Sequence, residues 1–411
     1  MAVSLKVDPA EVDWHVKKLA SFGAYGETGV WRIAYSPEWV AAQDQLAKWY
    51  QSAGLTPRMD AVGNLWGRLE GSAGGKLIAT GSHVDSQAPG GHYDGAQGVV
   101  AAFLAVKKLR ETCGQPKRPI EIVAFCEEEG SRFPAANLWA SRAITGQVKA
   151  EDLSVLGYDG LSMADALRGV GLDPARFAEA RRDDLEAFIE LHVEQGPFLE
   201  EAGLPVGVVS AITGLRHYQV TLTGRTDHAG GMPMDHRRDP MAGAAEIIAG
   251  VIGNALRMGR PAVTTVGRIK AEPGGPAIVP GKVVFTIDAR HPVPEQLQEL
   301  YRQHESLINE VASRRGLGLD VQINIEVPPV PMDTGIIALL EEAARERDIP
   351  YLVMASGAGH DTQRMASICR PGMIFVQSRD GRSHTPEEYT APEHAALGIE
   401  LLAAGLCRLA Y

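Results

Sequence analysis

The feature that most constrains the fold is a repeated change from short strand-type runs to helical patterns in the first half of the chain. Residues 77–80 and 120–125 are runs of strand-forming residues, and residues 95–110 between them have the apolar spacing of a helix. Residues 188–193 form a further strand pattern. This alternation predicts a largely parallel α/β sheet, in which functional groups gather at the carboxyl ends of the strands.

The middle of the chain has a different order of patterns. Strand patterns cover residues 217–223, 263–270, 282–290 and 319–327, and helical patterns cover residues 239–258 and 294–316. The order βαββαβ is that of a ferredoxin-like module. The proline-rich run VPPVP then indicates a linker, after which the α/β pattern resumes. We therefore expect one α/β domain built from residues 1–212 and 329–411, interrupted by an inserted domain at 213–328.

The composition excludes several classes of protein. Hydrophobic residues make up 45% of the 411 residues and charged residues 22%, as in soluble globular enzymes. A formal net charge of -11 disfavours nucleic acid as a partner. The four cysteines show no C-x-x-C spacing and indicate reduced thiols of an intracellular protein. Without a signal-peptide pattern or an apolar run that spans a membrane, we expect a cytoplasmic location and no membrane partner.

A glycine-rich loop after the first strand contains the first group of candidate metal ligands. It begins at His83 and Asp85 and continues through Asp94 into a helix. Asp85 can accept the second ring N–H of His83 and so fix the tautomer of this histidine. On its own, such an H-x-D pair is also common in ordinary surface loops.

Three further strand ends also present possible ligands. Glu127, Glu128 and Glu129 directly follow the strand at residues 120–125. Three adjacent carboxylates at a buried strand end repel one another unless a cation is present, although a solvated acidic turn is the alternative. His192 and His384 follow two other strands, and a lone histidine at either place would more often be structural.

Together, these strand ends lie on one edge of the expected sheet and predict a two-metal site. The expected ligands are His83, Asp94, Glu129, His192 and His384. Three imidazoles and two carboxylates suit two divalent ions such as Zn, Mn, Co or Ni. In such sites one carboxylate bridges ions about 3.5–4 Å apart.

Eight motifs make the chain resemble the dinuclear amidohydrolases related to aminoacylases and zinc carboxypeptidases. They are GSHVDS, GGHYDGAQG, EEEGSRF, HVEQGPF, TDHAGGMPMDHRRDP, FTIDARH, SGAGHD and SHTPEE. Within these enzymes the chain is most similar to the N-carbamoyl-L-amino-acid hydrolase, β-ureidopropionase and allantoate amidohydrolase group. The resemblance implies a zinc-exopeptidase-like catalytic domain and a homodimer formed through the inserted lid or dimerisation domain.

The resemblance also implies how the ligands divide between the two metals. Asp94 would bridge the ions, with His83 and His192 completing one site and Glu129 and His384 the other. Glu128 matches the general base of the family.

The resemblance further implies which residues contact a small substrate that carries a carboxylate. His228 matches a histidine that reaches into the active site of the neighbouring subunit and helps to hold the oxyanion. Arg290 matches the residue that grips the substrate carboxylate, for which a guanidinium is well suited. Gln195 and Gly359 match further substrate-contacting positions.

The implied reaction is metal-dependent hydrolysis of an N-carbamoyl amino acid or ureido acid to an amino acid, carbon dioxide and ammonia. One departure leaves an alternative open, because Ala277 stands where relatives usually have a substrate-contacting asparagine. That change motivates hydrolysis of another N-acyl amino acid or small amide. A non-catalytic binding protein on the same scaffold is a third reading, and retention of Glu128 and all five ligands argues against it.

Overall fold

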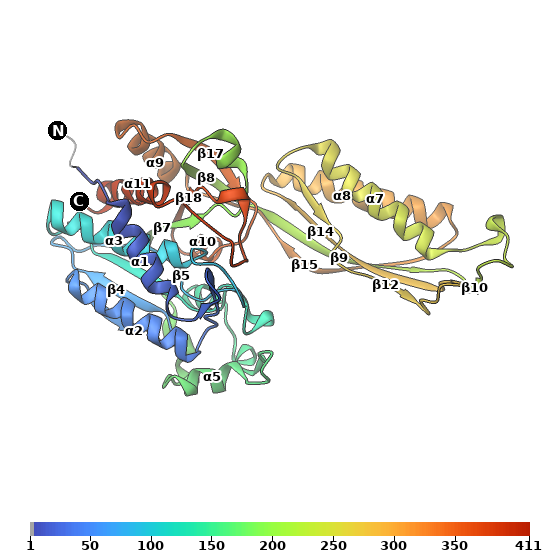
Figure 1. The fold of residues 1–411 in the computed structure, drawn as a ribbon, viewed down its shortest axis with the longest axis horizontal. Coiled ribbons are helices and arrows are strands. Elements are labelled where there is room, and N and C mark those ends of the chain that lie inside the picture. The colour runs from blue at the N-terminus through green and yellow to red at the C-terminus, as the bar shows by residue number, and fades with distance from the viewer. Residues whose placement is uncertain (1–3) are drawn as a thin grey trace. The chain divides into compact units, whose positions relative to one another are not determined.

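The computed structural model describes residues 4–411, which form two compact units (Figure 1). The main unit comprises the chain up to Ser210 together with Met332–Met354 and Ala358–Tyr411. The inserted unit comprises Ala211–Pro331 and Ala355–Gly357. The range expected from the sequence, residues 213–328, begins two residues after Ala211 and ends three residues before Pro331.

A nine-stranded mixed sheet forms the centre of the main unit, in the order β16-β8-β18-β7-β5-β6-β4-β3 with β17 beside β8. The strands are β3 (Thr56–Met59), β4 (Leu65–Leu69), β5 (Leu77–His83), β6 (Ile120–Phe125), β7 (Leu185–Val193), β8 (Val206–Ile212), β16 (Val330–Pro331), β17 (Tyr351–Ser356) and β18 (Arg370–Val376). The neighbours β18, β7, β5 and β6 are parallel, whereas β4 and β8 pair antiparallel with their neighbours. The expected α/β class is confirmed, and these four central strands supply its parallel pairs.

Helices of the main unit pack on this sheet or on one another. They are α1 (Pro9–Ala20), α2 (Pro37–Ser52), α3 (Ala96–Cys113), α9 (Thr334–Glu346), α10 (Asp361–Met365) and α11 (Pro392–Ala410). Helix α2 begins as its sequence indicates, because the Ser36 hydroxyl accepts a hydrogen bond from Trp39 N and Pro37 occupies the first turn. Shorter elements are β1 (Ala24–Tyr25), β2 (Gly29–Val30), α4 (Trp139–Ile144), α5 (Met163–Gly169) and α6 (Phe198–Ala202).

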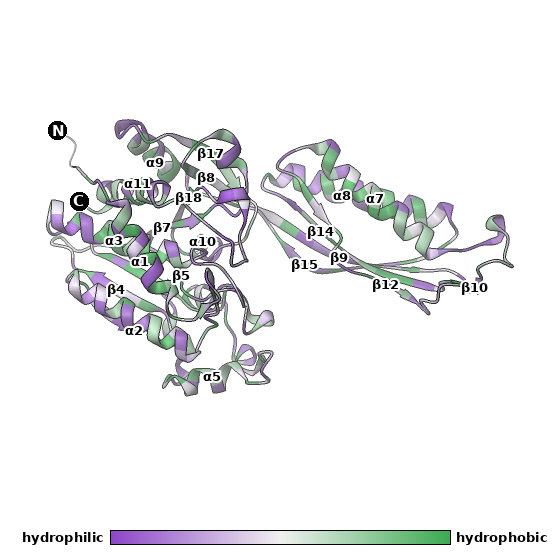
Figure 2. Ribbon diagram, viewed as in Figure 1, coloured by the Kyte–Doolittle hydropathy of each residue, from purple (hydrophilic) through white to green (hydrophobic). Residues whose placement is uncertain are grey.

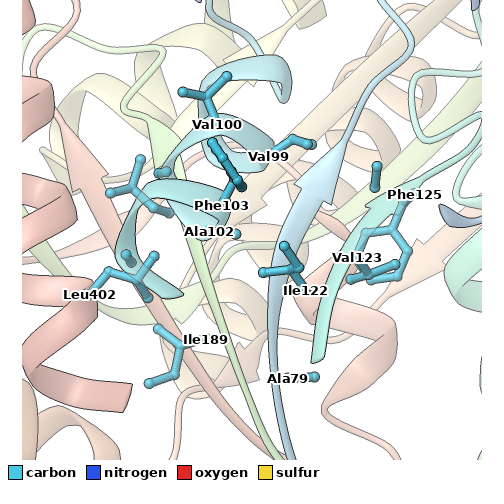
Figure 3. Packing of buried hydrophobic residues seen from close by; sticks show 14 of the residues in the cluster. Ala79, Val99, Val100, Ala102, Phe103, Ile122, Val123, Phe125, Ile189 and Leu402 are labelled. Atoms are coloured by element: carbon cyan, nitrogen blue, oxygen red, sulfur yellow. The ribbon is translucent and has the colours of Figure 1, made fainter. Parts of the chain in front are cut away.

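The core of the main unit lies where α3 packs on β5, β6 and β7 (Figure 3). Val99 and Phe103 of the helix, Ile122 of β6 and Ile189 of β7 belong to one buried cluster of hydrophobic side chains. Burying one such side chain contributes about 1.5–3 kcal/mol. The central strands are buried along nearly their whole length, as expected for parallel strands covered on both faces. This packing holds the carboxyl ends of the strands in fixed positions.

The inserted unit has the strand order and helix placement of a ferredoxin-like module. Its main elements are β9 (Gly214–Thr223), α7 (Pro240–Met258), β11 (Val263–Thr265), β12 (Ile269–Glu272), β14 (Lys282–His291), α8 (Pro294–Arg314) and β15 (Gly318–Val327). The antiparallel sheet runs β11-β14-β9-β15, and its buried face packs against α7 and α8. A separate hairpin pairs β10 (Asp227–His228) with β13 (Ile278–Val279).

The continuous strand expected at residues 263–270 is interrupted in the structure. Thr265 lies opposite Asp288, and Ile269 lies opposite Phe285. The chain therefore advances four residues from Thr265 to Ile269, whereas β14 advances only three between their partners. One extra residue of this kind is a β-bulge. The bulge divides the expected strand into β11 and β12, a feature that alternation of residue types does not reveal.

Helix α7 is the one helix among the described residues that is long and apolar enough to cross a membrane by length and composition. Hydrophobic residues extend along much of it (Figure 2). Ile247 and Val251 are buried against the sheet, whereas Ile252 and Leu256 are exposed, Leu256 to 77%. The helix therefore has a packed face and an apolar face that the inserted unit leaves uncovered.

Candidate metal centre

The five predicted ligands converge on the carboxylate of Asp94 in the main unit. Asp94 Oδ1 lies 3.2 Å from Nε2 of His83 and 3.2 Å from Nε2 of His192. Its other oxygen, Oδ2, lies 3.3 Å from Nε2 of His384. His384 Nε2 in turn lies 3.4 Å from Glu129 Oε2. Asp94 thus stands between two groups of ligand atoms, each close enough to share one cation.

The topology of the sheet explains why residues so distant in sequence meet. Because β18, β7, β5 and β6 are parallel neighbours, their carboxyl ends lie on the same edge. His83 is the last residue of β5, His192 lies near the end of β7, and Glu129 follows β6. His384 lies in the loop after β18 with φ = 57°, a left-handed conformation that few non-glycine residues adopt.

The acidic run after β6 does not act as a unit. Glu127 has φ = 56°, and its carboxylate accepts main-chain N–H groups of Arg132 (3.1 Å) and Phe133 (2.6 Å). Glu128 and Glu129 both lie close to His83, and Glu129 also lies close to Asp94 and His384. The left-handed turn therefore assigns Glu127 to the loop and the two following carboxylates to the site.

Close packing requires a glycine immediately after Asp94. Gly95 has φ = 61°, and a β-carbon on it would lie 2.3 Å from the His83 ring. Its N–H donates to His192 Nε2 at 3.2 Å. Only a residue without a side chain lets the loop approach both imidazoles this closely.

Main-chain oxygens orient the two buried imidazoles. His83 Nδ1 donates to the main-chain oxygen of Asp85 at 3.0 Å, and His192 Nδ1 donates to that of Val193 at 2.9 Å. With Nδ1 as the donor to these oxygens, Nε2 of each ring faces Asp94 and can bind a cation there once it has lost its proton, the arrangement usual for a metal-binding histidine. The Asp85 carboxylate is 3.9 Å from His83 Nδ1 and instead accepts the N–H groups of Glu128 and Glu129, each at 3.3 Å.

The charges at the centre also suit a cation. Burial alone would lower the pKa of His83, but the carboxylates of Glu128 and Asp94 outweigh it and raise this pKa well above its ordinary value. The hydrogen bond with Asp94 raises the pKa of His384 to about 9. Burial and repulsion from Asp94 raise the pKa of Glu129 to about 7. Glu129 Oε1 is buried without a hydrogen-bond partner among the described residues, so this donor set fits divalent cations that replace the protons.

Glu128 lies beside the ligands without being held by them. Its Oε2 is 3.8 Å from His83 Nε2, and its side chain is 12% exposed. Burial raises the pKa of Glu128 well above its ordinary value, and the positive charge of His83 opposes that effect only in part. A carboxylate in such a place is suited to take up and release a proton.

Two of the expected substrate-contacting residues belong to the main unit. Gln195 Nε2 donates to Asp94 Oδ2 at 2.7 Å and lies 3.3 Å from His384 Nε2. Gly359 is exposed and directly precedes His360, whose ring packs edge-on against His192 with centroids 4.5 Å apart. Gln195 is therefore in direct contact with the centre.

The other two, His228 and Arg290, belong to the inserted unit. Arg290 is on β14, where its Nε and Nη2 donate to the Asp288 carboxylate at 2.8 and 2.9 Å. Its Nη1 donates to Gly357 O at 3.2 Å. Arg290 also lines a pocket of about 540 Å³ within this unit, beside His217 and Tyr218. His228 is exposed at the end of β10.

The sequence analysis missed a carboxylate that supports the bridging ligand. Glu388 Oε2 accepts the main-chain N–H groups of Tyr93 and Asp94, both at 2.9 Å. The Ser383 hydroxyl lies 2.6 Å from Asp94 Oδ2 and 2.7 Å from Glu388 Oε1. Gln87 Nε2 similarly donates to Glu129 Oε2 at 2.7 Å. The motif SHTPEE contains Ser383 and Glu388, but only the fold shows which residues they contact.

Comparison with known proteins agrees with this geometry. Residues 79–407 match the peptidase family M20/M25/M40. The chain is 40% identical over 395 residues to allantoate amidohydrolase of Escherichia coli strain K12, with 96% of each chain covered. It is 39% identical over 401 residues to N-carbamoyl-L-amino-acid amidohydrolase of Paenarthrobacter aurescens, covering 97% of each. An amidase of the hydantoinase/carbamoylase family from Burkholderia multivorans superposes with a TM-score of 0.91 at 32% identity over 98% of both chains. The resemblance is confirmed: the chain belongs to the M20/M25/M40 family, among its allantoate and N-carbamoyl-amino-acid amidohydrolases.

Proposed function

We propose that this protein hydrolyses the linear C–N bond of an N-carbamoyl amino acid or a related ureido acid. The observation that carries the proposal is the convergence of His83, His192, His384 and Glu129 on Asp94, with Glu128 beside them. The relatives at 39–40% identity are named for substrates of this class. The products would be an amino acid or amine, carbon dioxide and ammonia.

We further propose two divalent cations per chain, of Zn, Mn, Co or Ni. His83 and His192 would hold one, Glu129 and His384 the other, and Asp94 would contact both. When bound, the cations supply Lewis acidity and lower the pKa of water. The main-chain contacts of His83 and His192 orient these rings, and Ser383 and Glu388 hold the Asp94 loop.

The role proposed for Glu128 is to move one proton. Its carboxylate takes a proton from the attacking water as the new C–O bond forms at the carbonyl carbon. The same carboxyl then gives the proton to the leaving nitrogen as the C–N bond breaks. One water molecule per substrate accounts for the products, because the carbamate fragment separates into carbon dioxide and ammonia.

Arg290 is proposed to bind the substrate carboxylate. Asp288 and Gly357 occupy three of the five N–H groups of its guanidinium, which leaves two for a ligand. Two parallel N–H groups are the usual means by which arginine binds a carboxylate. We propose that Gln195 and Gly359 add further substrate contacts, which the position of Gln195 beside Asp94 supports.

A substrate panel tests the proposal. Metal-loaded protein is incubated with N-carbamoyl amino acids, ureido acids and N-acyl amino acids, and ammonia and free amine are measured separately. Cleavage of a ureido or carbamoyl compound with release of both products supports the proposal. Cleavage of acyl amino acids alone would instead establish the second candidate function, hydrolysis of N-acyl amino acids. Ala277 favours this candidate because its side chain cannot hydrogen-bond a substrate.

We also propose that the protein is a cytoplasmic homodimer formed through the inserted unit. Ile252 and Leu256 leave an apolar face on α7, and the edge strand β15 exposes Ile323 and Ile325. Its cysteines are free. Sedimentation should give twice the chain mass, and Leu256→Asp should shift the species toward one chain mass. A monomeric native protein would contradict the proposal.

A further inference from the structure

We infer that Gln87 is the positioning residue of one of the two cation sites, the one formed by Glu129 and His384, and that it controls the metal affinity of this site. The Gln87 amide orients the Glu129 carboxylate by a direct hydrogen bond. The inference rests on the two cations of the proposed function and concerns how tightly one of them is held.

The contact between Gln87 and the metal centre is short. Gln87 Nε2 donates to Glu129 Oε2 at 2.7 Å, and this same oxygen lies 3.4 Å from His384 Nε2. The other oxygen, Glu129 Oε1, is buried without a hydrogen-bond partner among the described residues. A carboxylate that binds a cation is ionised and only accepts hydrogen bonds, so the nitrogen of the amide must face it. Gln87 therefore holds the carboxylate by the oxygen nearest to His384.

The two cation sites are supported by different kinds of contact. Main-chain oxygens orient the rings of His83 and His192, whose side chains are only 2% and 1% exposed. The His384 side chain is 49% exposed, and Glu129 is oriented by the side chain of Gln87. Loss of a side chain that orients a metal ligand usually weakens metal binding about 10–100-fold. A substitution of Gln87 should therefore act on one site and spare the other.

The loop that carries Gln87 is held in place on both sides of this residue. After it, Gly90 N donates to Val30 O at 2.8 Å, and Val30 N donates to Gly90 O at 2.9 Å. Before it, Ser86 N donates to Arg32 O, and Arg32 N donates to the Ser86 hydroxyl, both at 3.0 Å. The main chain around Gln87 is thus fixed before a cation binds, and this support lets the amide hold its ligand in one orientation.

A neutral amide suits this position. An ammonium or guanidinium group beside Glu129 would compete with the cation for the carboxylate, and a further carboxylate would repel Glu129. The amide N–H orients Glu129 without changing the net charge of the ligand set. Gln87 can therefore strengthen cation binding through geometry alone.

Metal titration of chelator-treated protein tests the inference without turnover. Zn²⁺ is added to the native protein and to Gln87→Leu, whose side chain has a similar size but cannot donate a hydrogen bond. We expect the first ion to bind as in the native protein and the second to bind about 10–100-fold more weakly. Gln51→Leu on the exposed face of α2 is the matched control and should bind both ions normally. Native affinity for the second ion in Gln87→Leu, or an equal loss of both ions, would overturn the inference.

A double substitution assigns the effect to one site. His384→Ala removes a proposed ligand of the same site, so adding Gln87→Leu to it should leave the affinity of the remaining ion unchanged. A further loss of affinity in the double variant would overturn the inference, because Gln87 would then act on the other site. In a zinc-loaded crystal the Gln87 amide should stay against Glu129. An amide oxygen at about 2.0–2.2 Å from a zinc ion would instead make Gln87 a ligand, which contradicts its assignment as a positioning residue.

The metal dependence of the rate gives an independent measurement. The Zn²⁺ concentration that produces half of the maximal rate should rise about 10–100-fold in Gln87→Leu, and added metal should restore the lost rate. A loss of rate that added metal does not restore would contradict the inference. A native protein that binds two ions but cleaves no substrate of the panel would count against the proposed function alone.

Discussion

Buried histidines occur in both units, but their surroundings differ. In the main unit, Glu128 and Asp94 lie beside the buried His83, and they raise the pKa of His83 well above its ordinary value despite burial. In the inserted unit, His304 lies between Asn254 and Thr264, and burial lowers the pKa of His304 to about 4. The first arrangement concentrates charges that a cation would balance, whereas the second contains only neutral groups. The neighbours of a histidine, rather than its burial, therefore distinguish a metal centre from a structural contact.

The two units also hold their functional groups differently. The ligands of the main unit constrain one another around Asp94. In the inserted unit, groups of that unit contact His228 Nδ1 and the Arg290 guanidinium. Substitutions of the ligands in the main unit should therefore lower metal binding and kcat. Substitutions in the inserted unit should instead weaken contacts with the substrate.

The largest effect is expected from Asp94→Asn. The neutral amide cannot balance two cations, so bound metal should fall below one ion per chain and kcat should fall by about 10³-fold or more. Metal analysis and steady-state rates measure both effects. Asp44→Asn on the exposed face of α2 is the control and should change neither. Full metal content in the Asp94 variant would contradict the claim that the ligands of the main unit depend on Asp94 to hold two cations.

Glu128→Gln should separate proton transfer from metal binding. We expect kcat to fall about 10²–10⁴-fold, the usual contribution of a general base, with metal content unchanged. Glu127→Gln is the matched control, because its amide oxygen can still accept the N–H groups of Arg132 and Phe133. If the Glu127 variant lost as much activity as the Glu128 variant, the assignment of the base would be wrong.

Acid should destabilise the inserted unit through His304. The pKa of His304 is about 4 in the folded protein and near 6.5 in an unfolded chain, so the unfolded chain binds more protons between these values. The contribution to stability is complete above pH 6.5 and lost as pH falls toward 4, a change of about 3 kcal/mol. Hydrogen exchange of α8 amides between pH 4 and 7 measures it. His304→Gln should show a shallower pH dependence, and identical slopes would contradict the prediction.

The smallest effect is expected from Arg290→Gln. Loss of the hydrogen bonds to the substrate carboxylate should lower kcat/KM about 10–100-fold, mainly through KM. A substrate in which a carboxamide replaces the carboxylate provides the control, because both proteins should cleave it at similar rates. A similar loss on both substrates would show that Arg290 supports the fold rather than the carboxylate.

Most of the architecture could be predicted because it depends on local patterns. The strand at residues 120–125 has the expected limits and the helix expected at residues 239–258 spans Pro240–Met258, since apolar runs and caps are encoded within a few residues. The helical pattern of residues 361–369 extends beyond α10, which ends at Met365, and the bulge after Thr265 divides the strand expected at residues 263–270. These boundaries depend on tertiary packing, which residue patterns describe poorly.

The candidate site likewise has features that the sequence predicts and features that depend on tertiary packing. The convergence of His83, Glu129, His192 and His384 follows from parallel strands ending on one edge. The contact between Glu388 and the Asp94 loop joins residues 294 positions apart, and no spacing rule predicts it. The main-chain contact of Asp85 with His83 likewise depends on the path of the loop rather than on residue type.

The central claim is that Asp94 joins two cation sites, and anomalous diffraction from crystals grown with zinc or manganese tests it most directly. We predict two anomalous peaks per chain, one beside His83 and His192 and the other beside Glu129 and His384, with Asp94 in contact with both. A metal-loaded crystal with no peak at these side chains, or with peaks elsewhere only, would contradict the account.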